Sequence, residues 1–219
     1  MTDYPPQPWD LRGWLHTSAY LVPVDMLPVP VPPGFRLVRI GRRCVVGAAW
    51  VHYEPGGVLS YSELMATVLV RRGWRIMPTI THIWVDSEES RDGGRALWAI
   101  PKDLAEFMMV AGNFEARDEK GLIARGSERH VVWLPGRWPL RFDIAQIQDG
   151  ATLVSPVQAR AKIALARVRV NPNPDGPLAF LAGRLPLFSL TVGDFRMWFG
   201  RRTAPDGLAS GPTRRSMAE

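Results

Sequence analysis

Residues 107–134, FMMVAGNFEARDEKGLIARGSERHVVWL, form the stretch that most clearly indicates a β-rich fold. Two runs rich in apolar and aromatic side chains, residues 107–117 and 122–134, flank the polar sequence DEKG at 118–121. Two such runs joined by a short turn that contains glycine are typical of a β-hairpin. The stretch therefore predicts a pair of antiparallel strands with the turn at 118–121.

Similar runs of Val, Ile and aromatic residues occur on both sides of this hairpin. Further strands are predicted for residues 35–40, 44–53, 60–70, 76–85, 161–170 and 185–192. In residues 161–170 the alternation changes phase, so we expect a bulge near Ala166 that keeps four large aliphatic side chains inside, those of Ile163, Leu165, Val168 and Val170. The prolines among the first 33 residues exclude a long helix there and favour extended segments and turns.

One helix is predicted for residues 87–97. Ser87 is a favourable N-cap, and Glu88 and Glu89 lie in the first turn, where negative charge suits the helix dipole. Gly93 and Gly94 weaken the helix, so we expect it to be short. Many strands with one or two short helices predict a β-rich protein of the α+β class.

The composition is that of a globular protein. Of 219 residues, 46% are hydrophobic and 22% are charged, which supports a buried core and excludes global disorder. We expect a single domain over residues 1–202 and a disordered tail over residues 203–219. No apolar run reaches membrane-spanning length, and the first residues do not resemble a signal peptide. Cys44 is the single cysteine, so a disulfide within the chain is excluded and a cytoplasmic location is expected.

The formal net charge of +6 suggests a test for nucleic-acid binding. Nucleic-acid binders usually concentrate basic residues on one face or stripe, whereas here they are spread along the chain. We therefore expect no nucleic-acid partner and no membrane partner. The four histidines show no metal-ligand spacing, so no metal site is expected.

Only three of the 27 basic residues are lysines, and one of them, Lys102, follows the apolar sequence LWAIP at 97–101. Pro101 restricts the backbone in front of this lysine. Burial can lower a lysine pKa by up to about 3–5 units, and a neutral amine attacks a ketone carbonyl to form a Schiff base. We expect Lys102 to be buried and uncharged, whereas a surface lysine after a turn proline is the alternative. Schiff-base chemistry at Lys102 depends on this expectation, and a nitrogen in solvent, or one paired tightly with a carboxylate, would contradict it.

The sequence GRALWAIPKDLA at residues 94–105 resembles the Gly-Arg-Glu…Pro-Lys-(Lys)-Leu signature of the acetoacetate decarboxylase family. Further segments resemble that family in the same order, at residues 24–33, 61–63 (YSE), 84–86 (WVD) and 175–178 (DGPL). The resemblance covers about residues 8–200. It implies a mostly antiparallel β-barrel, closed or cone-like, that holds the site inside, assembles as a homo-oligomer and needs no cofactor.

The resemblance also implies roles for individual residues. Lys102 matches the lysine that forms an iminium with a β-keto acid, and Glu63 matches an active-site glutamate that positions groups or transfers a proton. Tyr61 shares the strand face of Glu63 by the two-residue period. Arg12 is the nearest match to an arginine that meets the substrate carboxylate. Further substrate contacts are expected from three residues near the lysine segment, His82, Trp84 and Ile100; a core position is the alternative for the histidine.

Three positions depart from the family pattern. Asp103 replaces a second lysine, Ala96 replaces the Glu of Gly-Arg-Glu, and the segment GAAW at 47–50 lacks a carboxylate that the family has there. If residues 102–103 are extended, Asp103 points away from the amine of Lys102. The lysine is thus retained while its polar surroundings are reduced, which leaves the identity of the substrate open.

These observations predict a cofactor-independent lyase that decarboxylates a β-keto acid, or acts on a related ketone, through Lys102. Two alternatives remain on the same fold. The same iminium can serve an aldol condensation or a dehydration, or the protein binds a small molecule without turning it over. A structural oligomer without a ligand is distinguished from all of these by a pocket filled with side chains.

Overall fold

The structure of the protein is a computed structural model in which residues 4–27, 29–110 and 112–200 are described. The strands are, in chain order, β1 (Trp9–Pro23), β2 (Arg36–Leu37), β3 (Arg39–Ile40), β4 (Arg43–Tyr53), β5 (Tyr61–Arg72), β6 (Arg75–Val85), β7 (Lys102–Leu104), β8 (Glu106–Val110), β9 (Asn113–Asp118), β10 (Gly121–Trp133), β11 (Trp138–Gln148), β12 (Ala151–Pro172) and β13 (Phe188–Phe199). The helices of the described part are η1 (Val24–Met26), α1 (Glu88–Trp98) and η2 (Ala179–Leu181).

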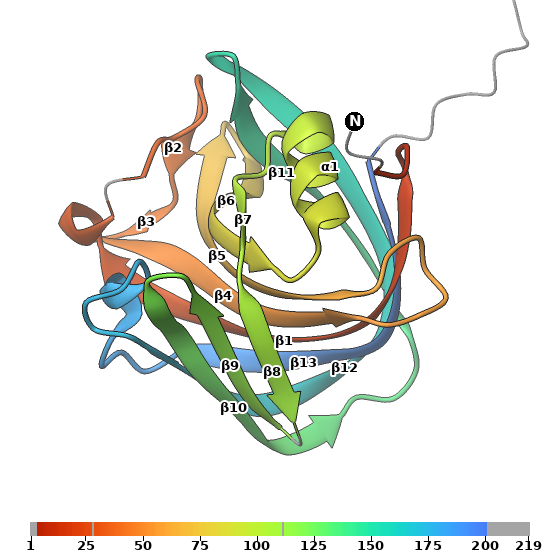
Figure 1. The fold of residues 1–219 in the computed structure, drawn as a ribbon. Coiled ribbons are helices and arrows are strands. Elements are labelled where there is room, and N and C mark those ends of the chain that lie inside the picture. Colours follow the sequence, from red (N-terminus) through yellow and green to blue (C-terminus); the bar gives the residue numbers. More distant parts are fainter. Residues whose placement is uncertain (1–3, 28, 111, 201–219) are drawn as a thin grey trace, which may run out of the picture.

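All of these strands belong to one large sheet. Its hydrogen-bonded order is β7-β6-β5-β4-β1-β13-β12-β10-β9-β8, with β11 beside β12, β2 beside β5 and β3 beside β4. The long central strands pair antiparallel, whereas β6 and β7 run parallel because α1 connects them. Figure 1 shows the long strands curving round as one layer, with α1 close to β6 and β7.

The predicted closed barrel is not confirmed, because no backbone pairing among the described residues joins β6 to β11. A side chain bridges this gap. The buried amide of Gln146 on β11 accepts a hydrogen bond from Ile80 N at 3.0 Å and donates one to Ile80 O at 3.1 Å. An ion pair between Arg75 and Asp143 links the same two strands at the surface. We refer to this line, held by side chains, as the β6–β11 seam.

Strands β4 and β5 are buried on both faces. On β5, Glu63 and Met65 face one side, and Leu64 and Ala66 face the other. The first side encloses a cavity between β1, β4, β5, β6, β11, β12 and β13. The second side packs against β8, β9, β10 and η2. Burial on both faces explains why residues 44–53 form a nearly continuous apolar run without strict alternation.

The hairpin predicted from residues 107–134 is partly confirmed. Strands β9 and β10 pair on either side of the turn at 118–121. Residues 107–117 nevertheless form two strands, β8 and β9, which pair with each other across a turn in which Gly112 has a φ of 75°. A glycine in the middle of an apolar run thus marks a second turn, because other residues rarely adopt this conformation.

The prediction for residues 161–170 is wrong in one respect. The register of β10 and β12 does shift near Ala166, where Arg129 pairs with Arg167 and Val132 pairs with Leu165, but the extra residue lies in β10 and not in the predicted strand. Leu165 is nevertheless 54% exposed, so the bulge does not bring all four aliphatic side chains inside.

The single helix is confirmed as α1, and the Oγ of its N-cap Ser87 accepts a hydrogen bond from Ser90 N. Residues 203–219 lie outside the described residues, and a single domain over residues 1–202 stays a prediction. No helix in the described part of the chain is long and apolar enough to cross a membrane.

Candidate active site

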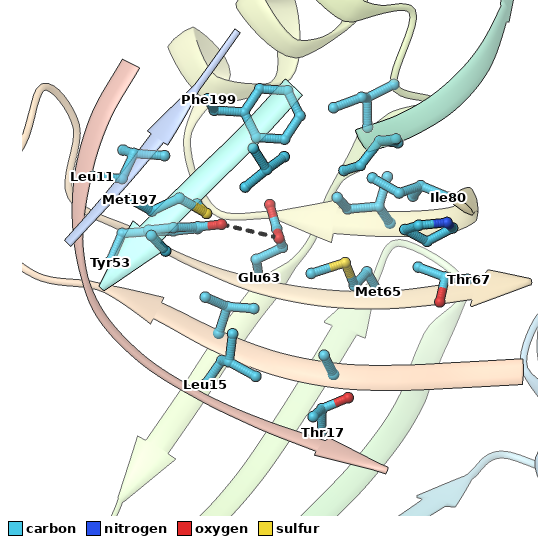
Figure 2. A pocket seen from close by; sticks show the side chains of 18 of the residues that line it. Leu11, Leu15, Thr17, Tyr53, Glu63, Met65, Thr67, Ile80, Met197 and Phe199 are labelled. Atoms are coloured by element: carbon cyan, nitrogen blue, oxygen red, sulfur yellow. Dashed lines mark hydrogen bonds between the residues drawn. The ribbon is translucent and has the colours of Figure 1, made fainter. Parts of the chain in front are cut away.

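A cavity of about 230 Å³ lies inside the curve of the sheet. Its walls are mostly apolar and come from seven of the strands described above, from β7 and from the end of α1. The polar side chains in the lining are those of Thr17, Tyr53, Tyr61, Glu63, Thr67 and Lys102. Figure 2 shows Glu63 near the centre of this lining, with Tyr53 beside it.

Lys102 is the centre of the polar groups. Its ammonium Nζ donates hydrogen bonds to Ser90 Oγ at 2.9 Å, to Glu63 Oε2 at 3.0 Å and to Tyr61 Oη at 3.3 Å. The lysine is 4% exposed and Glu63 is 2% exposed. An ammonium has three N–H donors, and here each of them has an acceptor. The geometry is therefore that of a protonated lysine in a buried ion pair.

The electrostatics correct the expectation of an uncharged lysine. Burial by itself lowers the pKa of Lys102, but the charge of Glu63 and the hydrogen bonds to Glu63 and Tyr61 outweigh it and raise this pKa above its ordinary value. Burial also raises the pKa of Tyr61 and, together with Glu63, holds the pKa of Tyr53 well above its usual range. Both tyrosines are therefore neutral phenols beside a charged pair.

Helix α1 supplies both a ligand and room for the lysine. Ser90 lies in its first turn, with its backbone N–H bound by Ser87, and its Oγ faces Lys102. One turn later comes Gly94, where a Cβ would meet Lys102 Cδ at 2.8 Å and Cε at 2.9 Å. At Gly93 a Cβ would meet the ring of Trp9 at 2.5 Å. The two glycines that weaken the helix in sequence thus permit its close approach to the site.

Strand β7 separates Lys102 from its acidic neighbour. Lys102 pairs in register with Ile83 of β6 and points into the cavity. Asp103 points to the opposite side, where it is 66% exposed and forms an ion pair with Arg95 of α1. The extended conformation therefore removes Asp103 from the amine, as expected for adjacent residues of a strand.

The structure brings together four of the seven predicted site residues. Lys102, Glu63 and Tyr61 are in direct contact, and Ile100 lines the same cavity. The placement of Arg12 does not support its predicted role, because it is exposed on β1, pairs in register with Arg196 of β13 and does not line the cavity.

His82 and Trp84 also lie away from the cavity. The register of β5 and β6 shifts so that Ala66 pairs with His82 and Thr67 pairs with Ile80, which leaves Thr81 as an extra residue. This bulge puts Ile80 on the cavity face, whereas His82 stacks near Trp84 and Phe180 in the other core. Simple alternation from residue 80 to 84 therefore gave the wrong face, and the alternative of a core histidine is the observed placement.

Sequence reasoning missed Ser90, Tyr53 and Gly94. Ser90 follows the N-cap Ser87 by three residues, so its backbone role was visible but its side-chain direction was not. Tyr53 pairs in register with Tyr61 across β4 and β5, and its hydroxyl lies 3.5 Å from Glu63 Oε1. Pairing of this kind depends on a register between distant strands. Among the described residues, no group of three His, Cys, Asp or Glu side chains is placed to hold a metal ion.

The comparisons with known proteins agree with this fold. A sequence model of the acetoacetate decarboxylase family matches residues 2–182, and the chain belongs to this family. A search of curated proteins found no match.

Similar solved structures show the same fold at low sequence identity. Acetoacetate decarboxylase from Legionella pneumophila is 18% identical over 93% of this chain and 90% of its own, with a TM-score of 0.64. The enduracididine biosynthesis enzyme MppR, complexed with pyruvate, is 15% identical over 90% and 89%, with a TM-score of 0.61. An acetoacetate decarboxylase-like enzyme from Sphingomonas wittichii RW1 is 15% identical over 87% and 90%, with a TM-score of 0.55.

Proposed function

We propose that the protein is a lyase that forms a Schiff base between Lys102 and a carbonyl substrate, with decarboxylation of a β-keto acid as its reaction. The observation that carries the proposal is the burial of Lys102, 4% exposed, on the wall of an apolar cavity. Its pairing with Glu63 Oε2 at 3.0 Å contradicts the expected free amine, so the proposal depends on a proton transfer between these two groups. A buried lysine with an adjacent proton acceptor is suited to covalent catalysis. Membership of the acetoacetate decarboxylase family supports the same chemistry.

Glu63 is the group that activates the amine. Because the pKa of Lys102 is raised, burial alone does not supply a free amine, and the ammonium must give up a proton within the site. Glu63 is in contact with it, and a transfer from Nζ to Oε2 turns a buried ion pair into a neutral pair. The Nζ lone pair then forms a bond to the carbonyl carbon, and the protonated Glu63 returns its proton to the oxygen to give a carbinolamine. Glu63 next takes a second proton from the attached nitrogen and passes it to the same oxygen, which leaves as water while the nitrogen forms the iminium.

The iminium formed in this way accepts the electrons of the next step. The bond between the α-carbon and the carboxylate breaks, CO2 leaves, and its bonding pair moves into the iminium to give an enamine. A proton added at the α-carbon restores the iminium, and water releases the ketone and Lys102. Tyr61, whose hydroxyl lies 3.3 Å from Nζ, is placed to keep the nitrogen oriented through these steps.

Aldol condensation or dehydration is the second candidate, and the charges in the cavity favour it. Lys102 is the single cationic side chain among the described residues that line the cavity, and Glu63 already neutralises it. A substrate carboxylate would add an uncompensated charge in apolar surroundings, which costs free energy. MppR, with a similar fold, has been crystallised with the condensation product of pyruvate and imidazole 4-carboxaldehyde. A neutral carbonyl compound has no carboxylate, so its iminium with Lys102 needs no second cation in the cavity to compensate a negative charge.

Borohydride trapping tests the common step. The protein is incubated with acetoacetate, pyruvate and longer keto acids, borohydride is added, and the intact mass is measured. We expect a mass increment that is lost in Lys102→Arg and kept in the matched controls Lys120→Arg and Lys162→Arg, both of which change exposed lysines. No adduct with any carbonyl compound, or an adduct that persists in Lys102→Arg, would contradict the proposal.

Product analysis separates the reactions. Release of CO2 from the trapped keto acids supports decarboxylation, whereas condensation with an added aldehyde and no CO2 supports the second candidate. An adduct without either product indicates binding only. The homo-oligomer, the cytoplasmic location and the independence from a cofactor stay predictions.

A further inference from the structure

The cavity is larger than a small keto acid requires. An apolar cavity of about 150 Å³ accommodates benzene, and by the same scale a cavity of about 230 Å³ accommodates about nine carbon-sized atoms. Acetoacetate has seven non-hydrogen atoms, four carbon and three oxygen, so room for about two more remains. Filling the remainder requires a longer molecule.

The charged groups lie toward one part of the cavity. Strand β5 lines it with Tyr61, Glu63, Met65 and Thr67 in that order, and the contacts of Lys102 are to the first two of these. At about 3.3 Å per residue, Thr67 lies roughly 13 Å along β5 from Glu63. Figure 2 shows Met65, Thr67 and Ile80 on the side of Glu63 opposite to Tyr53. The cavity therefore runs along the strand, away from the reacting nitrogen.

Small side chains on β4 leave this space open. Across the sheet, Met65 pairs with Ala49, and Thr67 pairs with Gly47. A Cβ at Gly47 would meet Thr67 Oγ1 at 2.7 Å, so a larger residue there would narrow the cavity. These two positions belong to the segment that lacks the carboxylate of the family pattern. Its loss makes this wall small and apolar.

The far part of the cavity also approaches the surface. Phe142 of β11 lines the cavity and is 44% exposed, whereas Lys102 is 4% exposed. Gln146 of β11 bonds to Ile80 of β6, and Asp143 of β11 pairs with Arg75 at the start of β6. Because β7 pairs with the end of β6, Phe142 lies at the end of the cavity away from β7. A substrate that reaches the amine from this side arrives with its carbonyl first and its chain behind.

We propose that the site selects carbonyl compounds that carry an unbranched apolar chain, with the carbonyl carbon at Lys102 Nζ and the chain along β5 toward Thr67. The inference rests on the proposed Schiff-base chemistry and names its substrate class. Apolar walls favour each buried methylene, and a polar substituent on the chain would lose its water without gaining a charged partner. The polar groups of the substrate therefore belong at the carbonyl end.

A homologous series of methyl ketones tests the chain. The concentration of 2-butanone, 2-heptanone and 2-nonanone that gives half-maximal borohydride trapping is measured by intact mass. Burial of one methylene corresponds to about a fourfold change, so we expect about sixtyfold tighter trapping of 2-heptanone than of 2-butanone. A difference below threefold overturns the chain proposal and leaves the Schiff base intact. No adduct with any ketone or keto acid overturns the Schiff base itself.

Variants locate the chain in the cavity. Ala49→Leu fills the space beside Met65. We therefore expect the preference for 2-heptanone over 2-butanone to fall below fivefold, while 2-butanone is still trapped. Ala96→Leu makes the same change on the exposed face of α1 and should keep the full preference. If circular dichroism shows that Ala49→Leu is not folded, Met65→Ala is the variant to test. It enlarges the cavity, so we expect the trapping of 2-nonanone to improve more than that of the shorter ketones. An unchanged preference in the folded variants overturns the proposal.

Discussion

Gly94→Ala tests how closely α1 must approach the reacting lysine. The added Cβ would lie 2.8 Å from Lys102 Cδ and 2.9 Å from Cε, whereas carbon atoms in contact are separated by about 3.5–4.0 Å. The lysine side chain must therefore move by about 1 Å. Its Nζ, which is 3.0 Å from Glu63 and 2.9 Å from Ser90, would then lose at least one of these hydrogen bonds.

The expected result is a loss of reactivity with little loss of stability. Overpacking costs about 1–3 kcal/mol, but alanine is favoured over glycine within a helix by about 1 kcal/mol, which offsets part of this cost. A displacement of about 1 Å at a reacting group can lower the rate by about a hundredfold. We therefore expect the rate of borohydride trapping in Gly94→Ala to fall between tenfold and a hundredfold, measured by intact mass against time.

The control is Ala96→Gly, which lies in the same helix, is exposed and does not line the cavity. It should destabilise the protein by about 1 kcal/mol in urea unfolding and leave the trapping rate unchanged. Trapping at the wild-type rate by a folded Gly94→Ala protein would refute the reasoning, because the contact between α1 and Lys102 would then have no effect on the amine.

Three further predictions concern charge and the seam. Because the folded-state pKa of Lys102 is raised, the ion pair with Glu63 stabilises the protein below the unfolded pKa of about 10.5, and this contribution is lost as pH rises through the folded value. Glu63→Gln should abolish this alkaline loss in urea unfolding and slow borohydride trapping, because Lys102 loses its proton acceptor; an unchanged alkaline loss would count against the pair. Burial lowers the pKa of His16 to about 4, so the unfolded state binds a proton at higher pH than the folded state does. The stability of the wild type in urea unfolding should therefore fall as pH decreases from about 6.5 to 4, and this fall should be absent in His16→Asn. Gln146→Leu leaves Ile80 N–H and C=O without their side-chain partner and should destabilise the protein by about 2–4 kcal/mol. Equal unfolding midpoints in wild type and Gln146→Leu would exclude a role for the bridge.

The sequence was sufficient for several of the strands and for the burial of Lys102. Apolar runs with turns between them predicted β4, β5, β6 and β10, and the Pro-Lys context of Lys102 indicated a buried amine. It was not sufficient for β1 and β11. The prolines of the first segment concealed β1, and β11 alternates weakly because it lies at the seam with one neighbouring strand.

The faces and partners of the site residues needed three-dimensional information. His82 and Trp84 were assigned to the wrong face because the bulge at Thr81 has no mark in the sequence. The charge of Lys102 was also predicted wrongly, because burial and an adjacent carboxylate act in opposite directions and the contact with Glu63 joins residues 39 positions apart. Local patterns identify reactive groups, but the sign of a pKa shift depends on which groups the fold brings together.

In the described part of the chain, side chains and not backbone hydrogen bonds join the two strands at the β6–β11 seam, so the curved sheet resembles a ring that is open at one place. Everywhere else along the path from β6 to β11, neighbouring strands are held by backbone ladders, which resist separation cooperatively. At the seam, one amide and one surface ion pair hold two strands that line the cavity. Widening the ring by a small amount therefore breaks the links made by Gln146 and by the Arg75–Asp143 pair, while every backbone ladder stays intact.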